Sequence, residues 1–127
     1  MSPLKILHVD ENHPLMLERL ERLGYHNDLA YTTPLEEILK TINTYDGMVI
    51  RSRFPIDKKF IDTAQNLRFI ARVGAGLENI DVKYAQSKNI HLIAAPEGNR
   101  NAVGEHAIGL LLGLMNKLRL GHHSIQQ

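Results

Sequence analysis

The sequence of 127 residues has no cysteine and no tryptophan, and its charges nearly cancel, with 15 Lys and Arg against 14 Asp and Glu. The lack of cysteine excludes thiolate nucleophiles, zinc–thiolate sites and disulfides within the chain. The balanced charge gives no reason to expect binding to nucleic acid or to an anionic membrane. The most apolar stretch, AIGLLLGLM, has nine residues, whereas a membrane span needs about 20. We therefore expect a cytoplasmic protein.

Short apolar runs alternate with helical patterns along most of the chain. Strands that alternate with helices indicate a parallel sheet covered on both faces. Five strands in this rhythm predict an α/β fold, a flavodoxin-like doubly wound sheet in the order 2-1-3-4-5. The expected strands are 4–9, 28–33, 47–52, 67–73 and 90–95, and the expected helices are 14–23, one that begins at Pro34, 58–64 and 80–89.

A long helical pattern begins near Asn101 and is apolar around most of its circumference. A helix of this kind needs neighbours on nearly every side, but one five-stranded sheet offers only one side. We expect it to pack on something that this chain does not contain; burial by its own loops is the alternative. The apolar positions are Ala107, Ile108, Leu110, Leu111, Leu112, Leu114, Met115 and Leu118.

The stretch RVGAGLENID, residues 72–81, places two glycines one residue apart, Gly74 and Gly76. A dinucleotide-binding fingerprint requires a third glycine, but Asn79 stands there, and the loop follows the fourth strand instead of the first. Glu78 would also repel a pyrophosphate. Two interpretations remain: a site where backbone N–H groups bind a small anion, or a tight turn without a ligand.

The stretch RSRF, residues 51–54, ends the third strand at the same edge of the sheet. Arg51, Ser52 and Arg53 offer two guanidinium groups and a hydroxyl, and arginine suits bidentate recognition of carboxylate or phosphate. A solvated pair of charges is the alternative. It is weakened by the position, since the strand end faces a glycine loop that begins with Arg72.

The stretch HVDENHP, residues 8–14, resembles the acidic strand end of a response-regulator receiver. A receiver needs an aspartate after its third strand, where this chain has Arg51–Arg53, and a lysine after its fifth, where it has Ala95–Glu97. The receiver interpretation is therefore disfavoured. The seven histidines show no spacing typical of metal ligands, and no nucleophile–base–acid set is present. We expect no metal site.

Three segments together, RSR, RVGAGLENID and PEGNRNAVGEHAIGLLLGLM, resemble the D-2-hydroxyacid dehydrogenases. The resemblance covers essentially the whole chain in order and spacing and is closest to the phosphoglycerate dehydrogenase branch. It implies a fragment of a two-domain enzyme. Residues 1–98 would be the substrate-binding domain, and 99–127 a long crossover helix between the domains. That helix would lead to a Rossmann NAD-binding domain that the chain lacks.

The resemblance also implies the site residues. The loop from Arg72 to Gly76 would offer N–H groups to the substrate carboxylate, and Arg51 would contact the anionic tail. The expected substrate-binding residues are Arg51, Ser52, Arg72, Val73, Gly74, Ala75, Gly76 and Asn99. Ala75 and Val103 would touch the nicotinamide side of the cofactor. No catalytic residue is assigned, because the family's Arg, Glu and His set would lie further along.

The parent protein would therefore oxidise the CH–OH of a D-2-hydroxy acid, with 3-phosphoglycerate as a candidate, and would use NAD or NADP. Its ligand would be a small anionic 2-hydroxy or 2-oxo acid, and it would form a homodimer through the helix 101–120. The isolated chain is expected to be inactive and to bind no NAD tightly. The alternative is a stand-alone module for small-anion binding or dimerisation, against which the apolar final helix argues.

Overall fold

A computed structural model of the chain describes residues 2–95, 107–109 and 111. Its centre is a parallel five-stranded sheet in the order β2-β1-β3-β4-β5. The predicted fold and strand order are confirmed. The strands are β1 Lys5–His8, β2 His26–Leu29, β3 Gly47–Ile50, β4 Phe69–Arg72 and β5 His91–Ile93.

The second strand lies earlier in the chain than the sequence predicted. Pairing with β1 begins at His26, which is opposite Lys5, and ends where the N–H of Ala30 donates to the carbonyl of His8. The chain then turns, since the N–H of Thr33 donates back to the carbonyl of Ala30. The strand HNDL has few apolar side chains because it lies at the edge of the sheet, where the apolar pattern is a weak guide.

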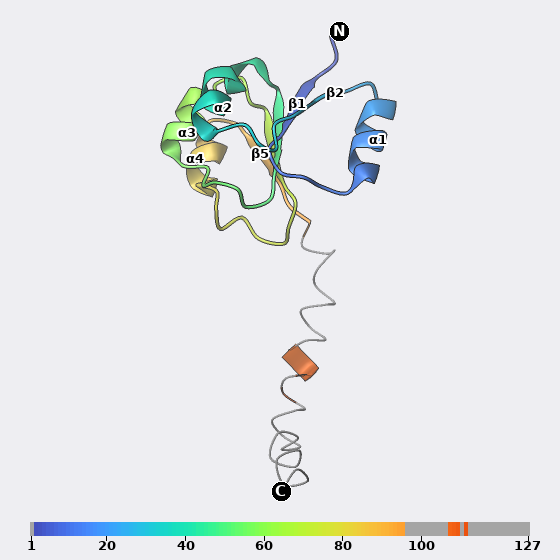
Figure 1. The fold of residues 1–127 in the computed structure, drawn as a ribbon. Helices are drawn as coiled ribbons and strands as arrows, with labels where there is room; N and C mark the ends of the chain where they lie inside the picture. Colours follow the sequence, from blue (N-terminus) through green and yellow to red (C-terminus); the bar gives the residue numbers. More distant parts are fainter. Residues whose placement is uncertain (1, 96–106, 110, 112–127) are drawn as a thin grey trace, which may run out of the picture.

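The helices divide unevenly between the two faces of the sheet. Three of them cover one face, whereas α1 lies alone on the other (Figure 1). The helices are α1 Pro14–Arg22, α2 Leu35–Thr41, α3 Lys58–Thr63 and α4 Val82–Ser87, with a 3-10 turn η1 Ile42–Thr44 after α2. The main core fills the three-helix side, where Leu7, Met48 and Ile70 are neighbours across the strands and almost fully buried.

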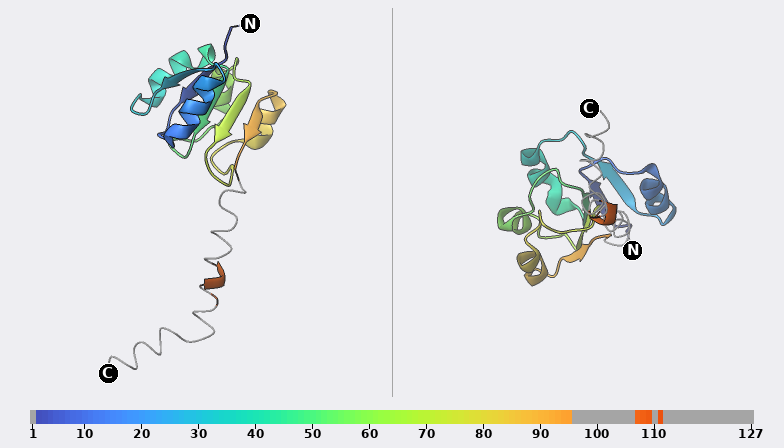
Figure 2. Two further views of the ribbon diagram at one scale, coloured as in Figure 1. Left: turned by 90° about the vertical axis from the view of Figure 1, so that its right-hand side faces the viewer. Right: turned by 90° about the horizontal axis from the view of Figure 1, so that it is seen from below.

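The face beneath α1 is only partly covered (Figure 2). An apolar groove of about 390 Å³ lies there, lined by Leu4, Ile6, Met16, Leu20, Tyr25, Val49, Phe69, Ala71 and Ile93. Within the helix expected at 14–23, the leucine spacing of the sequence predicts an inner face of Leu15, Leu17, Leu20 and Leu23. That prediction is wrong for the two ends, since Leu15 is 46% and Leu23 70% exposed. Met16 takes the place of Leu15, because positions 16 and 20 are one turn apart.

His8 is a buried polar side chain of the core, 1% exposed, and its Nε2 lies 2.9 Å from Oδ1 of Asn27. Because an amide oxygen only accepts, Nε2 carries the hydrogen. Burial lowers the pKa of His8, and the hydrogen bond to Asn27 offsets this in part. The folded protein therefore keeps this imidazole neutral at a pH where the unfolded chain, with a histidine pKa of about 6.5, takes up a proton.

Stability should fall as the pH drops below about 6.5, because only the unfolded state gains the proton at this position. For one group the slope is at most about 1.4 kcal/mol per pH unit. Urea unfolding of the wild type and of His8→Gln between pH 7.5 and 5 measures it. In His8→Gln, the free energy of unfolding should fall less between pH 7.5 and 5 than in the wild type. In His91→Gln, at an exposed position of β5, it should fall as much as in the wild type. Equal slopes in all three proteins would contradict this account.

Candidate functional site

The carboxyl ends of the central strands border one open pocket of about 400 Å³. Ile50 is paired with Arg72 at the ends of β3 and β4, and the N–H of Ala95 donates to the carbonyl of Gly74 at 3.0 Å. These bonds bring the loops that follow β3, β4 and β5 together. The pocket is lined by Asn12, His13, Arg51, Val73, Gly74, Ala75 and Ala95. Ligands of open α/β sheets bind at this edge.

Several of the predicted site residues meet at this pocket, namely Arg51, Val73, Gly74 and Ala75. Ser52 and Gly76 lie in the same loops and Arg72 ends β4, but these three do not line the pocket. Asn99 and Val103 lie outside the described residues. Sequence reasoning missed Asn12, His13 and Ala95. Asn12 and His13 belong to the stretch HVDENHP, and their position directly after the first strand was the signal that could have placed them here.

The carboxylate of Asp10 binds the loop that follows β3. Its Oδ2 accepts from the backbone N–H groups of Arg51, Ser52 and Arg53, at 2.6, 3.2 and 3.3 Å. A carboxylate that accepts from consecutive backbone N–H groups holds the loop in place. A bound substrate anion could otherwise occupy the same N–H groups. These amides are therefore not open to a ligand, and the loop contributes side chains to the site instead of N–H groups.

The side chain of Arg53 stabilises the fold and does not face the pocket. Its guanidinium donates to the carbonyls of Val9, Ala30 and Thr33, and so ties together the ends of β1 and β2 and the start of α2. The prediction that both arginines of RSRF offer a free guanidinium is wrong for Arg53. Arg51 is exposed and borders the pocket, so it alone of this pair can face a ligand.

Arg72 connects the two loops of the site. Its Nε donates to the carbonyl of Arg51 at 2.9 Å, and its Nη1 donates to the carbonyl of Gly76 at 2.8 Å and lies 3.7 Å from Oε2 of Glu78. The side chain is 19% exposed. The guanidinium therefore braces the glycine loop against the end of β3, and a direct contact between Arg72 and an anion stays a prediction.

Comparison with known proteins decides the family. The family model described as the catalytic domain of D-isomer specific 2-hydroxyacid dehydrogenases matches residues 6–120 of the sequence. The chain belongs to this dehydrogenase family. The resemblance seen in the sequence is thereby confirmed, and relatives of the phosphoglycerate dehydrogenase branch are among the matches.

A curated dehydrogenase and two solved structures show the extent of the match. The D-3-phosphoglycerate dehydrogenase of Archaeoglobus fulgidus is 28% identical over 124 residues, which are 98% of this chain and 24% of that protein. The NAD+-bound 3-phosphoglycerate dehydrogenase of Entamoeba histolytica gives a TM-score of 0.69 at 28% identity, over 88% of this chain and 39% of that one. The PH0520 protein of Pyrococcus horikoshii OT3 shares the fold, with a TM-score of 0.88 at 24% identity, over 97% of this chain and 37% of that one. The chain thus spans about a quarter of the length of the curated dehydrogenases that it matches.

Membership of this dehydrogenase family raises the question of where the pyrophosphate of a nicotinamide dinucleotide would bind, and the glycine loop does not fit that group. A Cβ atom at Gly74 would lie 2.6 Å from Nη1 of Arg72, and one at Gly76 would lie 2.1 Å from Oε1 of Glu78. Neither glycine has a positive φ. The glycines therefore make room for the protein's own side chains, and the carboxylate of Glu78 would repel a pyrophosphate.

Within the described ranges, no helix is long and apolar enough to cross a membrane.

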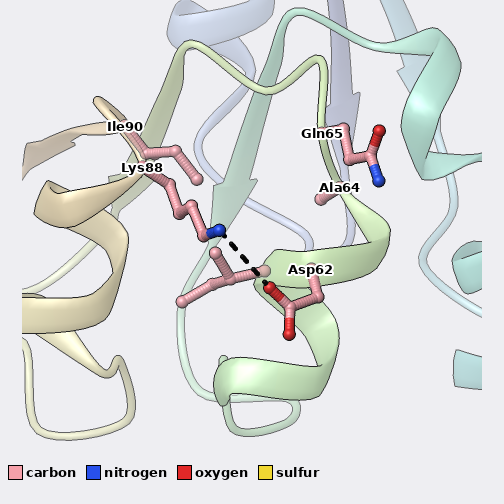
Figure 3. A pocket seen from close by; sticks show the side chains of 6 residues that line it. Asp62, Ala64, Gln65, Lys88 and Ile90 are labelled. Atoms are coloured by element: carbon pink, nitrogen blue, oxygen red, sulfur yellow. Dashed lines mark ion pairs between the residues drawn. The ribbon is translucent and has the colours of Figure 1, made fainter.

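A second cavity lies between α3 and the segment that connects α4 to β5 (Figure 3). It has about 330 Å³ and is lined by Ile61, Asp62, Ala64, Gln65, Lys88 and Ile90. Its charges are paired, since Nζ of Lys88 lies 3.9 Å from Oδ1 of Asp62 and the hydroxyl of Tyr84 donates to the same oxygen at 2.5 Å. That hydrogen bond also raises the pKa of Tyr84. Because these charges are paired, the cavity has little to attract an anionic substrate.

The described part of the chain also holds no group of three His, Asp or Glu residues suited to a metal ion.

The different positions of the two arginines predict different effects on stability. Arg53→Met should lower the free energy of unfolding by about 2–4 kcal/mol, because the carbonyls that it binds lose a charged donor. Arg51→Met, the matched control two residues away, should leave stability essentially unchanged. Urea denaturation of both variants measures this. Equal losses of stability, or a larger loss for Arg51→Met, would contradict the assignment.

Proposed function

We propose that residues 1–98 form the substrate-binding domain of a D-2-hydroxyacid dehydrogenase and that the pocket of about 400 Å³ binds its small anionic 2-hydroxy or 2-oxo acid. The observation that carries the proposal is that Arg51 and the segment Val73–Ala75, predicted from two separate loops, line one pocket. Family membership supports the class of reaction. A stand-alone anion-binding module is not favoured, since the family match runs through most of the chain, residues 6–120.

The two sides of the pocket suit the two ends of a phosphorylated hydroxy acid. The N–H groups of Gly74 and Ala75 donate no backbone hydrogen bond to any described residue, and they would bind the carboxylate. The guanidinium of Arg51 would bind the phosphate. 3-Phosphoglycerate, which carries both groups, is therefore the candidate substrate. Ser52 and Gly76 would support the two loops, and Asn99 would join the site from the following segment.

The cofactor, NAD or NADP, would be bound by a Rossmann domain of the parent protein, which residues 99–127 would connect to the substrate domain. Ala75 borders the pocket and, with Val103, would meet only the nicotinamide side. Hydride transfer also needs an acid–base pair and a group that polarises the carbonyl, and neither is assigned in this chain. The isolated chain would therefore bind substrate weakly and show no turnover.

The anion site is testable by NMR titration of the ¹⁵N-labelled chain with 3-phosphoglycerate. The amide signals of residues 73–76 should shift, with a dissociation constant of about millimolar, since the pocket is open to water and each charged hydrogen bond contributes about 1.5–3 kcal/mol. Arg51→Ala should lower the affinity for 3-phosphoglycerate by roughly tenfold. It should lower the affinity for D-lactate much less, because only 3-phosphoglycerate carries a phosphate.

Arg68→Ala is the matched control, since Arg68 is exposed directly before β4, at the end of the strand away from the pocket, and its replacement should not affect the binding of either ligand. Binding that leaves the signals of 73–76 in place while others move would contradict the proposed site. Micromolar affinity for NAD, measured by calorimetry, would contradict the assignment of the cofactor site to another domain.

We also infer a homodimer formed through residues 101–120. Two members of that segment support this inference, Ile108 and Leu111, which are one turn apart and 60% and 56% exposed. Exposed apolar side chains at this spacing form a stripe that a second copy can cover.

Light scattering during size-exclusion chromatography should give the mass of a dimer at high concentration. Leu111→Glu should shift the protein toward monomer, because a charge in an apolar interface is costly. Leu23→Glu, at a leucine that is 70% exposed after α1, should leave the dimer intact. A wild type that stays monomeric at every concentration would overturn the inference.

A further inference from the structure

The backbone of Arg51 is held from both sides. Its N–H group donates to Oδ2 of Asp10 at 2.6 Å, and its carbonyl accepts from Nε of Arg72 at 2.9 Å. At the same time, Nη1 of Arg72 donates to the carbonyl of Gly76 at 2.8 Å. One guanidinium group therefore joins the backbone of the loop after β3 to the backbone of the glycine loop, although the two loops follow different strands.

The position of this guanidinium depends on the residue at position 74. A Cβ atom at Gly74 would lie 2.6 Å from Nη1 and 2.9 Å from Cζ of Arg72, whereas nonbonded heavy atoms normally lie about 3.5 Å or more apart. Gly74 has no positive φ, so its backbone conformation is open to other residues. The requirement for glycine is therefore steric, because the guanidinium of Arg72 occupies the space of a side chain at position 74.

The second glycine of the loop has a less demanding neighbour. A Cβ atom at Gly76 would overlap the carboxylate of Glu78. The side chain of Glu78 is 79% exposed and can turn into solvent, whereas that of Arg72 is 19% exposed and donates to two carbonyls. A side chain at position 74 must therefore break the hydrogen bonds of Arg72, and a side chain at position 76 need not.

The free N–H groups of the loop lie between its points of attachment. The N–H of Val73 and the carbonyl of Gly74 are bound by backbone groups of neighbouring segments, and the carbonyl of Gly76 is bound by the side chain of Arg72. The N–H groups of Gly74 and Ala75 donate to no described backbone group. Of the three attachments, the one made by Arg72 comes from a side chain, so a substitution can remove it.

We propose that Arg72 is a positioning residue of the substrate site. Its guanidinium, placed beside Gly74, holds the glycine loop against the backbone of Arg51, so that the free N–H groups of the loop face the pocket. Gly74 then makes room for this guanidinium, and the ligand needs no contact with Arg72. The inference rests on the proposed function, since it concerns how the same anion site is kept in shape.

A double-mutant cycle tests this, read by NMR titration of the ¹⁵N-labelled full chain with 3-phosphoglycerate. Arg72→Met should lower the affinity about tenfold and should shift the amide signals of Gly74 and Ala75 before any ligand is added. Gly74→Ala should lower the affinity about three- to tenfold in the wild type. In the Arg72→Met background it should cost about twofold or less, because no guanidinium is left to displace.

The matched control for the cycle is Arg68→Met, since Arg68 is exposed directly before β4. In that background, Gly74→Ala should lower the affinity as much as it does in the wild type. Affinities are measured at a temperature where each variant gives the spectrum of a folded protein, so that a loss of stability is not counted as a loss of affinity. Should Arg72→Met not fold, Arg72→Lys takes its place in the cycle.

Two single variants separate positioning from other roles of these residues. Arg72→Lys keeps the positive charge, but a lysine lacks the planar fork that donates to two carbonyls at once. Its affinity for 3-phosphoglycerate should therefore be close to that of Arg72→Met. Gly76→Ala should lower the affinity less than Gly74→Ala does, because the side chain of Glu78 can move into solvent.

The outcomes distinguish the inference from the proposed function. If Gly74→Ala lowers the affinity by the same factor in the wild type and in Arg72→Met, the glycine serves the approach of the ligand, and the inference is overturned while the proposed function stands. Wild-type affinity in Arg72→Lys would have the same consequence, since the charge alone would then suffice. If 3-phosphoglycerate shifts no amide of residues 73–76 in the wild type, both are overturned.

Discussion

The carboxylate of Asp10 holds the candidate site together. It accepts from the amides of residues 51–53, and so fixes the loop after β3 against the loop after β1. This contact gives the loop that carries Arg51 a defined place beside the loop of Asn12 and His13, so that all three residues border one pocket. An acidic residue at the end of the first strand thus acts here as an internal anion that organises a positively charged loop.

The three arginines near the site differ in what their guanidinium groups contact. Arg53 donates to carbonyls at the ends of β1 and β2 and before α2, and Arg72 donates to carbonyls of both site loops. Only Arg51 lines the pocket. Two guanidinium groups therefore stabilise the loops, which lets a single exposed one face the ligand without the loops having to be ordered on binding.

The sequence predicted the topology well, because alternating buried strands and helices leave few arrangements of a parallel sheet. It also predicted that residues 51 and 73–75 would meet, since neighbouring strands end at one edge. It did not reveal that Arg53 and Arg72 bind backbone carbonyls. Those carbonyls belong to residues that are distant in sequence from the arginines or lie in irregular loops. No pattern of side chains in the sequence indicates which carbonyl an arginine will bind.

Two other misjudged features have local causes. The edge strand β2 lacks the apolar pattern that marks buried strands, so its position was displaced toward the next apolar residues. The inner face of α1 was placed on Leu15 instead of Met16, because several leucines in a short helix allow more than one apolar stripe. The role of the loop HVDENHP was missed because its Asn and His contacts become visible only once the loops have a position in space.

The central claim is that the edge formed by Arg51, His13 and the loop 73–76 is the substrate site of a hydroxyacid dehydrogenase. A crystal of the chain soaked with 3-phosphoglycerate tests it most directly. The account predicts the carboxylate at the amides of Gly74 and Ala75 and the phosphate at Arg51. A ligand bound instead in the cavity beside Asp62, or in the apolar groove beneath α1, with this edge left empty, would contradict it.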